Sequence, residues 1–109
     1  MMTCNQVYEF SDVRLKTEIE ELDEHDLSQL KPVKYKWKNL PDSGIIYGFL
    51  AQDILEIFPN MVKEDGSGIL SLDYNQFIPL LIKKVQTQEV KIQELENNMN
   101  IIFEHFGIV

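Results

Sequence analysis

Residues 75–106, "NQFIPLLIKKVQTQEVKIQELENNMNIIFEHF", carry apolar side chains at alternating steps of three and four residues. This spacing is the a/d pattern of a coiled coil, in which one stripe of a long helix packs against a partner helix. Pro79 fits the first turn if Asn75 caps the helix, because a proline there interrupts no helical hydrogen bond. At 1.5 Å per residue the predicted helix is roughly 45 Å long. The predicted a and d residues are Ile78, Leu81, Val85, Gln88, Ile92, Leu95, Met99, Ile102 and Phe106.

Charged residues beside this stripe favour pairing between chains. In a parallel coil, a residue at position g meets the residue five places later in the neighbouring chain. This rule pairs Lys84 with Glu89 and Lys91 with Glu96, which are opposite charges in both cases. A single amphipathic helix folded back on its own domain is the alternative, but such a helix has no need of matched charges.

The number of strands in the coil stays open from the residues alone. Isoleucine and valine at a with leucine at d permit a dimer. The polar Gln88 at d, together with apolar side chains at Ile82 and Phe103, widens the stripe and favours three strands.

The preceding residues predict an α+β body with short helices and one small antiparallel sheet. Alternation of apolar and polar side chains indicates strands, "PDSG" and "EDGSG" indicate turns, and a three-to-four spacing before a proline indicates short helices. The predicted strands are 33–38, 45–51 and 69–74, and the predicted short helices are 23–32 and 52–58. Because Val33, Tyr35 and Trp37 alternate with lysines, we expect Tyr35 and Trp37 to be buried between the sheet and the helix around residues 54–58.

Composition limits the class of function. The chain has 109 residues, 44% of them hydrophobic, which supports one folded domain. Its formal charge of −8 disfavours nucleic acid and anionic membranes as partners. No apolar run approaches the roughly 20 residues that span a bilayer. His25 and His105 lie far apart without a metal-ligand pattern, and no glycine-rich phosphate loop is present, so we expect no metal and no cofactor.

A possible catalytic pair lies near the start of the chain, in "EFSDVRLK" at residues 9–16. A serine becomes a nucleophile when a base takes its proton, and lysine is a known base if burial or a nearby cation lowers its pKa from about 10.4. Ser11 and Lys16 face different directions on a regular helix or a flat strand, so a dyad requires a bend between them or a neighbouring subunit. From these residues alone, Asp12 as a helix cap and an ion pair with Arg14 are the favoured roles.

Four motifs occur in order: "SDVRLK" at 11–16, "LKPVKYKWK" at 30–38, "GFLAQDILEIFPNMV" at 48–62 and "LSLDYNQFIPLLIKKVQ" at 70–86. Together they resemble the intramolecular chaperone auto-processing domain found at the C-terminus of phage endosialidase tailspikes and related fibre proteins. The same domain is found in the eukaryotic myelin regulatory factors. The resemblance covers about residues 11–96.

The resemblance implies a homotrimer that helps an upstream fibre to fold and then cuts itself off. It implies that Ser11 is the nucleophile, Lys16 its partner and Phe10–Ser11 the bond that is cut, which makes the chain a serine peptidase that acts once. Residues 1–10 would be the end of the upstream segment and 11–109 the domain, with an α+β body at 11–74 and a coiled-coil helix at 75–106. Supporting motif residues are Asp12, Arg14, Gln52, Asp73 and Tyr74.

The resemblance also implies a place of action. Assembly would occur in the cytoplasm of the infected cell, and the parent fibre would be on the virion. The alternative is a trimerisation or protein-interaction module whose peptidase residues are idle in this chain.

Overall fold

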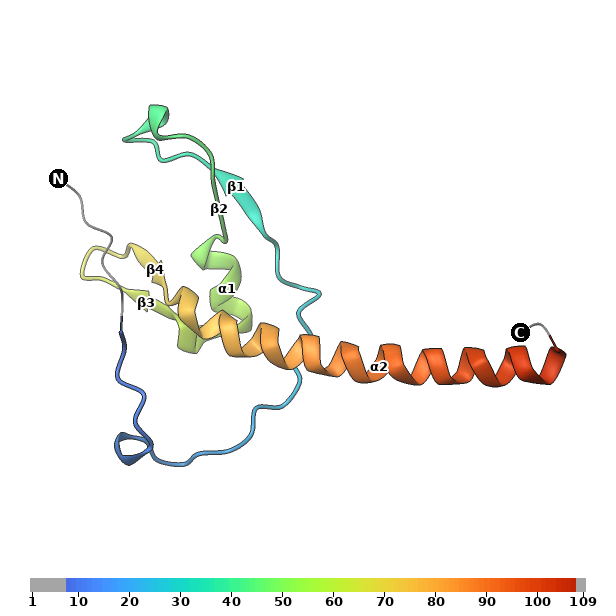
Figure 1. The fold of residues 1–109 in the computed structure, drawn as a ribbon. Helices are drawn as coiled ribbons and strands as arrows, with labels where there is room; N and C mark the ends of the chain where they lie inside the picture. The colour runs from blue at the N-terminus through green and yellow to red at the C-terminus, as the bar shows by residue number, and fades with distance from the viewer. Residues whose placement is uncertain (1–7, 108–109) are drawn as a thin grey trace.

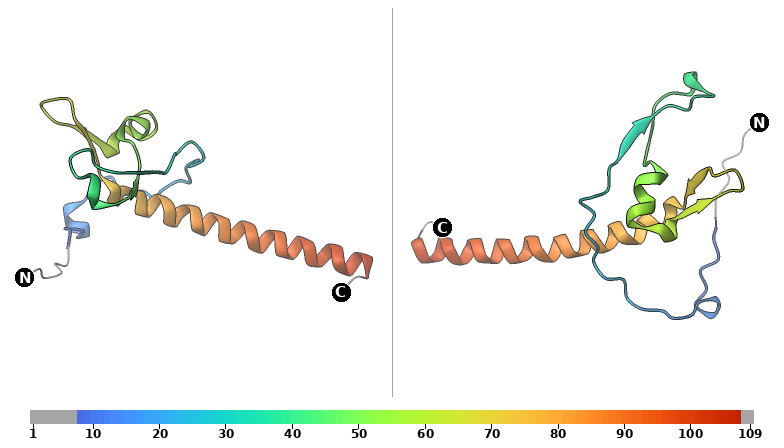
Figure 2. Two further views of the ribbon diagram at one scale, coloured as in Figure 1. Left: turned by 90° about the horizontal axis from the view of Figure 1, so that it is seen from above. Right: turned by 180° about the vertical axis from the view of Figure 1, so that it is seen from behind.

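The computed structural model describes residues 8–107 and confirms the α+β class (Figure 1). Short elements form a body at one end of the long helix α2, Phe77–Phe106 (Figures 1 and 2). The predicted sheet is divided into two separate antiparallel hairpins within the described residues. A small body therefore surrounds the first part of α2, and the rest of the helix projects away from it.

The first hairpin joins β1, Val33–Tyr35, to β2, Ile46–Gly48, with Lys34 opposite Tyr47. Gly48 is required by a close approach. A Cβ at this position would lie 2.6 Å from the hydroxyl oxygen of Tyr74. That hydroxyl accepts a hydrogen bond from the Phe49 backbone N–H at 3.0 Å. The end of β2 is thereby attached to the segment that leads into α2.

The second hairpin follows helix α1, Ala51–Ile57, and a short 3₁₀ turn, Pro59–Met61. It joins β3, Val62–Glu64, to β4, Leu70–Leu72. The carboxylate of Asp65 organises the intervening turn, because it accepts hydrogen bonds from the backbone N–H groups of Ser67 at 2.7 Å and Ile69 at 3.1 Å. The turn predicted from "EDGSG" is confirmed.

The core lies where α1 and this second hairpin meet the first turns of α2. Partly buried apolar side chains from the loops and strands surround it. Its buried side chains are Ile54, Phe58, Met61, Phe77 and Leu80. Phe49 stacks on Phe77 with ring centroids 4.9 Å apart, which extends the core toward β2.

The long helix confirms the predicted range to within two residues, but its start differs from the prediction. A 3₁₀ turn, Tyr74–Gln76, leads into α2. The N-cap residue of α2 is Gln76, which makes no side-chain capping bond. Asn75 is therefore not the cap. The helix ends at Gly107, whose φ of 68° is the left-handed conformation that glycine adopts readily.

Two expectations about the body are wrong. No helix forms at 23–32, where the carboxylate of Asp26 accepts a hydrogen bond from the Ser28 N–H at 2.9 Å and so favours a local turn over a helix. Trp37 is 53% exposed and not buried, because β1 ends at Tyr35 and the indole, beyond the strand, packs edge-on against the Tyr35 ring. Tyr35 itself is half-buried.

The N-terminal part of the body is an open segment. Residues 17–32, here called the strap, run without regular secondary structure from the first turn to β1, passing beside α2 (Figure 1). In the described part of the chain, no helix combines the length and apolarity that a bilayer crossing requires.

Candidate functional site

A tight turn near the described N-terminus brings Ser11 and Lys16 together. The backbone forms a 3₁₀ turn at Val13–Leu15, with the Leu15 N–H bonded to the Asp12 carbonyl at 3.0 Å and the Lys16 N–H to the Val13 carbonyl at 3.1 Å. This turn bends the chain between the two side chains. Lys16 Nζ donates a hydrogen bond to Ser11 Oγ at 2.8 Å. The bend that a dyad requires at this spacing is therefore present.

Asp12 holds the turn in place. Its carboxylate accepts hydrogen bonds from the Arg14 backbone N–H at 2.9 Å and from the Arg14 Nη2 at 2.6 Å. These bonds favour the charged forms of both groups, so the side-chain hydrogen bond with Arg14 lowers the pKa of Asp12 and raises that of Arg14. The capping role of Asp12 and its ion pair with Arg14 are both observed.

The turn is open to solvent in the single chain. Every residue from Phe10 to Lys16 is exposed, and the Phe10 side chain is 96% exposed. Lysine bases usually work where water is excluded or a second cation is near. The Ser11–Lys16 pair has the contact distance of a dyad but lacks this enclosure.

Of the other motif residues, Asp73 and Tyr74 lie just before α2, and Gln52 lies in α1. The Tyr74 hydroxyl bonds the backbone of Phe49, and the Asp73 N–H bonds the Met61 carbonyl at 2.9 Å. Gln52 is an exposed residue in the first turn of α1. Asp73 and Tyr74 thus attach the start of α2 to the body.

One long-range contact between the start of α2 and the segment before Ser11 was not expected from the sequence. The Asn75 side-chain amide donates a hydrogen bond to the carboxylate of Glu9, two residues before Ser11. The two residues are 66 positions apart, so no local pattern in the sequence could indicate the pair.

The predicted a/d stripe lies on the outside of the single chain. Its apolar members are between 48% and 68% exposed, and Gln88 is also exposed. Within residues 8–107, the one other α-helix, α1, leaves this stripe exposed. An exposed apolar stripe of this length is a common feature of surfaces through which proteins interact.

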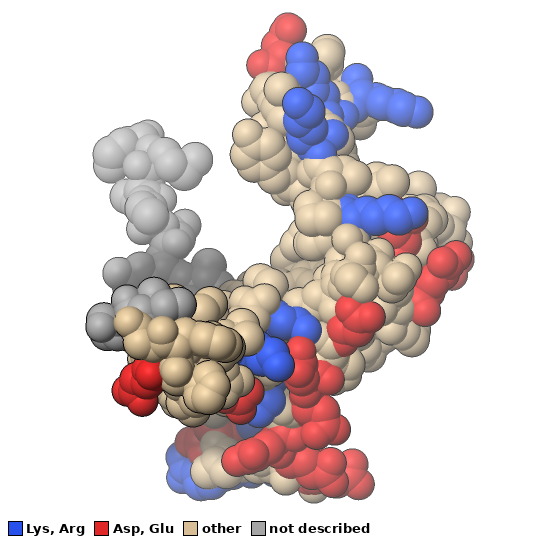
Figure 3. Space-filling model, turned by 90° about the vertical axis from the view of Figure 1, so that its right-hand side faces the viewer, with Lys and Arg blue, Asp and Glu red and all other residues tan. Residues whose placement is uncertain are grey.

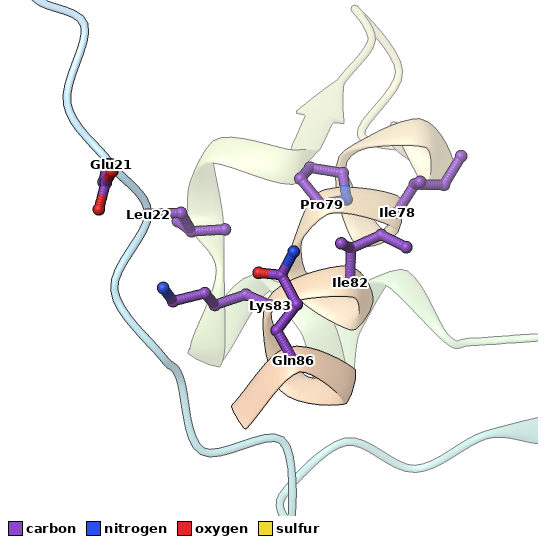
Figure 4. A pocket seen from close by; sticks show the side chains of 7 residues that line it. All are labelled: Glu21, Leu22, Ile78, Pro79, Ile82, Lys83 and Gln86. Atoms are coloured by element: carbon purple, nitrogen blue, oxygen red, sulfur yellow. The ribbon is translucent and has the colours of Figure 1, made fainter. Parts of the chain in front are cut away.

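The strap runs beside the first turns of α2, where it approaches Ile78 at the start of the stripe. Leu22 points toward the helix across an open hollow of about 520 Å³ (Figure 4). The hollow is lined by Glu21, Leu22, Ile78, Pro79, Ile82, Lys83 and Gln86. Farther along the strap, Glu24 accepts a salt bridge from Lys84 Nζ at 2.5 Å. Lys84, expected to pair with Glu89 of another chain, is held here by its own chain.

Charge is distributed unevenly over the surface. Lysines gather over the first hairpin at the top of the view in Figure 3, whereas acidic side chains gather around the strap and α2 below. Six of the nine residues at 18–26 are acidic. Among the described residues, no group of three or more His, Cys, Asp or Glu side chains is placed to hold a metal ion.

Parts of this chain are similar in sequence to known proteins. Residues 11–63 match a family named as a peptidase and described as the chaperone of endosialidase. The chain is 35% and 34% identical to the long tail fiber proteins Gp37 of Enterobacteria phages M1 and Ox2, over 84% of this chain and 41% of each relative. It is also 35% identical to an uncharacterized protein, VP1, of a Micromonas pusilla reovirus, over 62% of this chain and 4% of that protein. The chain thus spans less than half the length of these relatives. The resemblance expected from the four motifs is confirmed.

Proposed function

We propose that this chain, whose residues 11–63 match the chaperone of endosialidase family, is a folding helper for an upstream fibre and releases itself by cutting Phe10–Ser11. The observation that carries the proposal is the hydrogen bond of 2.8 Å between Lys16 Nζ and Ser11 Oγ, in a turn that begins at the expected cleavage site. The similarity to two phage tail fibre proteins supports a fibre as the protein that is helped.

The proposed reaction uses Ser11 as nucleophile and Lys16 as base. Neutral Lys16 accepts the hydroxyl proton while Ser11 Oγ attacks the carbonyl carbon of Phe10. The peptide C–N bond breaks, the Ser11 nitrogen receives the proton and becomes a free amine, and Phe10 remains as an ester on Ser11 Oγ. Water then hydrolyses the ester, which leaves a Phe10 carboxylate and restores the Ser11 hydroxyl. Because nucleophile and carbonyl belong to adjacent residues, placement limits the rate and encounter does not.

Assembly is proposed to supply the enclosure that the turn lacks in the single chain. The apolar stripe of α2 binds the same stripe of two further copies in a parallel homotrimer, with residues 75–106 as the coil and 11–74 as the body. Three bodies and three upstream segments then meet at the same end of the coil. Such packing would exclude water from Lys16, as a base lysine requires.

The trimer also explains how a helper of this kind works. Fibre β-structure has many contacts between residues far apart in sequence, and such folds form slowly. A helix has local contacts and assembles early, after which it holds three upstream chains at a high effective concentration. Cleavage then removes the helper from a fibre whose persistence depends on a high unfolding barrier. This work would take place in the cytoplasm of the producing cell, before the fibre is mounted on the virion.

The test is intact-mass measurement of a precursor that carries its natural upstream sequence. We expect a C-terminal fragment that begins at Ser11 in the wild type, no fragment with Ser11→Ala, and severely slowed cleavage with Lys16→Ala. Lys63→Ala, which removes another exposed lysine, is the matched control and should cleave normally. Cleavage that persists in Ser11→Ala would overturn the peptidase proposal.

A second candidate function is a trimerisation module without peptidase activity. The observation that favours it is the solvent exposure of Ser11 and Lys16. It predicts that the wild-type precursor forms trimers and stays intact, so the same measurement separates the two functions.

A further inference from the structure

The side chain of Phe10, the residue just before the proposed cut, does not fix the position of that residue. The ring is 96% exposed, so the domain makes no pocket for it. A peptide bond that reacts with a neighbouring hydroxyl must nevertheless be held in a narrow range of geometries. The restraint on the bond must therefore come from the residues on either side of Phe10.

On the downstream side the restraint is the first turn. Asp12 and Arg14 fix it through hydrogen bonds of 2.6 and 2.9 Å, and Lys16 reaches back to Ser11. These contacts are all local, between residues no more than five positions apart. They set the shape of the turn but do not attach it to the body.

On the upstream side the restraint is the hydrogen bond between the Glu9 carboxylate and the Asn75 side-chain amide. Asn75 lies in the 3₁₀ turn that starts α2, between two residues that are themselves attached to the body. Tyr74 bonds the Phe49 N–H at 3.0 Å, and Gln76 accepts a hydrogen bond from the Asn60 amide at 3.1 Å. Asn75 is therefore presented from a fixed part of the fold.

From this geometry we infer that Asn75 is a positioning residue for self-cleavage, and that the domain recognises Glu9, rather than Phe10, upstream of the cut. This inference rests on the proposed self-cleavage at Phe10–Ser11. The Glu9–Asn75 hydrogen bond and the turn fixed by Asp12 and Arg14 restrain the chain on opposite sides of the peptide bond that reacts. The contact also links the cleavage segment to the first residues of the assembly helix.

The experiment is a double-mutant cycle on the cleavage rate of the precursor with its natural upstream sequence. Glu9→Ala and Asn75→Ala should each slow cleavage about tenfold, the order expected for a hydrogen bond to a charged acceptor. The double variant should be no slower than the slower single variant, because both remove the same bond. Asn75→Asp places a second carboxylate opposite Glu9 and should be slower than Asn75→Ala. Phe10→Ala should slow cleavage less than Glu9→Ala does, because the exposed Phe10 ring is not enclosed by the domain.

Controls separate positioning from folding. Gln93→Ala removes a side-chain hydrogen bond with Asn97 farther along α2, outside the apolar stripe, and its cleavage rate should match the wild type. Thermal unfolding and oligomeric state of the Asn75 variants should also match the wild type. Independent, multiplying effects of Glu9→Ala and Asn75→Ala, or a Phe10→Ala effect larger than that of Glu9→Ala, would overturn the inference while Ser11-dependent cleavage stands. A wild-type precursor that is never cleaved would instead remove the proposed function, and this inference with it.

Discussion

At the scale of single residues, the short polar motif around Ser11 was largely predictable. The capping of the turn by Asp12 and its pairing with Arg14 follow from the local preferences of aspartate and arginine. The requirement for a bend follows from the five-residue spacing of Ser11 and Lys16. The Glu9–Asn75 bond was not predictable, because it depends on how the whole chain returns to the start of α2.

The hydrogen bonds between the Asp12 carboxylate and Arg14, here called the Asp12 clamp, give a pH-dependent prediction at this scale. These bonds lower the pKa of the Asp12 carboxyl below the ordinary value of about 3.9. A lowered pKa in the folded turn means that the clamp contributes fully above the ordinary value and is lost as the pH falls through the lowered one. We expect the carboxyl carbon of Asp12, followed by NMR, to titrate below its ordinary range. Arg14→Ala should raise the midpoint toward that range, because it removes the side-chain hydrogen bond and leaves the bond from the backbone N–H, and an unchanged midpoint in this variant would contradict the clamp.

At the scale of elements, the predictions were most accurate for segments with a strong periodicity of apolar residues. The stripe of α2 and the apolar spacing of α1 located both helices, and turn residues located the second hairpin. The prediction of a helix at 23–32 was wrong. Two leucines three residues apart supply little periodicity, and Asp26 forms a local turn that competes with a helix. The burial of Trp37 was wrong because alternation in the sequence continues for two residues beyond the end of β1.

The position of Gln88 in the stripe gives a prediction about α2. If position 88 faces the interior of a coil, Gln88→Ile replaces a polar side chain with an apolar one at a buried position. It should then raise the free energy of unfolding by about 1 kcal/mol or more per chain, and the thermal midpoint with it. Gln93→Ile makes the same change outside the stripe and is the control, for which no comparable rise is expected. The measurement is circular dichroism during heating at equal protein concentration. A lower midpoint for Gln88→Ile than for Gln93→Ile would place residue 88 outside the interface.

At the scale of the whole molecule, the single chain is far from compact. Its radius of gyration is 20.8 Å, whereas a compact domain of this length has about 13 Å. Within the described residues, five apolar side chains are buried, while the apolar stripe of α2 and many other large apolar side chains are exposed. A core of this size contributes little stability on its own, so we expect that folding and association are coupled.

This expectation is tested by the oligomeric state in solution. Light scattering at tens of micromolar should give the mass of three chains, and the thermal midpoint should rise with protein concentration because association stabilises the folded state. Glu24→Ala frees Lys84 from the strap for pairing between chains, so it should leave the trimer intact. A monomer at this concentration, or a midpoint independent of concentration, would contradict the coiled-coil interpretation of α2.

The open position of Ser11 and Lys16 has a consequence for the timing of synthesis. A ribosome produces about 95 further residues between Ser11 and the end of α2 at Phe106. At about 5–20 residues per second, this takes roughly 5–20 s. A dyad that was fully active as soon as it emerged would separate the fibre from its helper before the helper existed. Under the proposed function, a solvent-exposed pair that needs the finished helix for its enclosure would delay the cut until α2 has been made, so chains truncated before α2 would stay uncut.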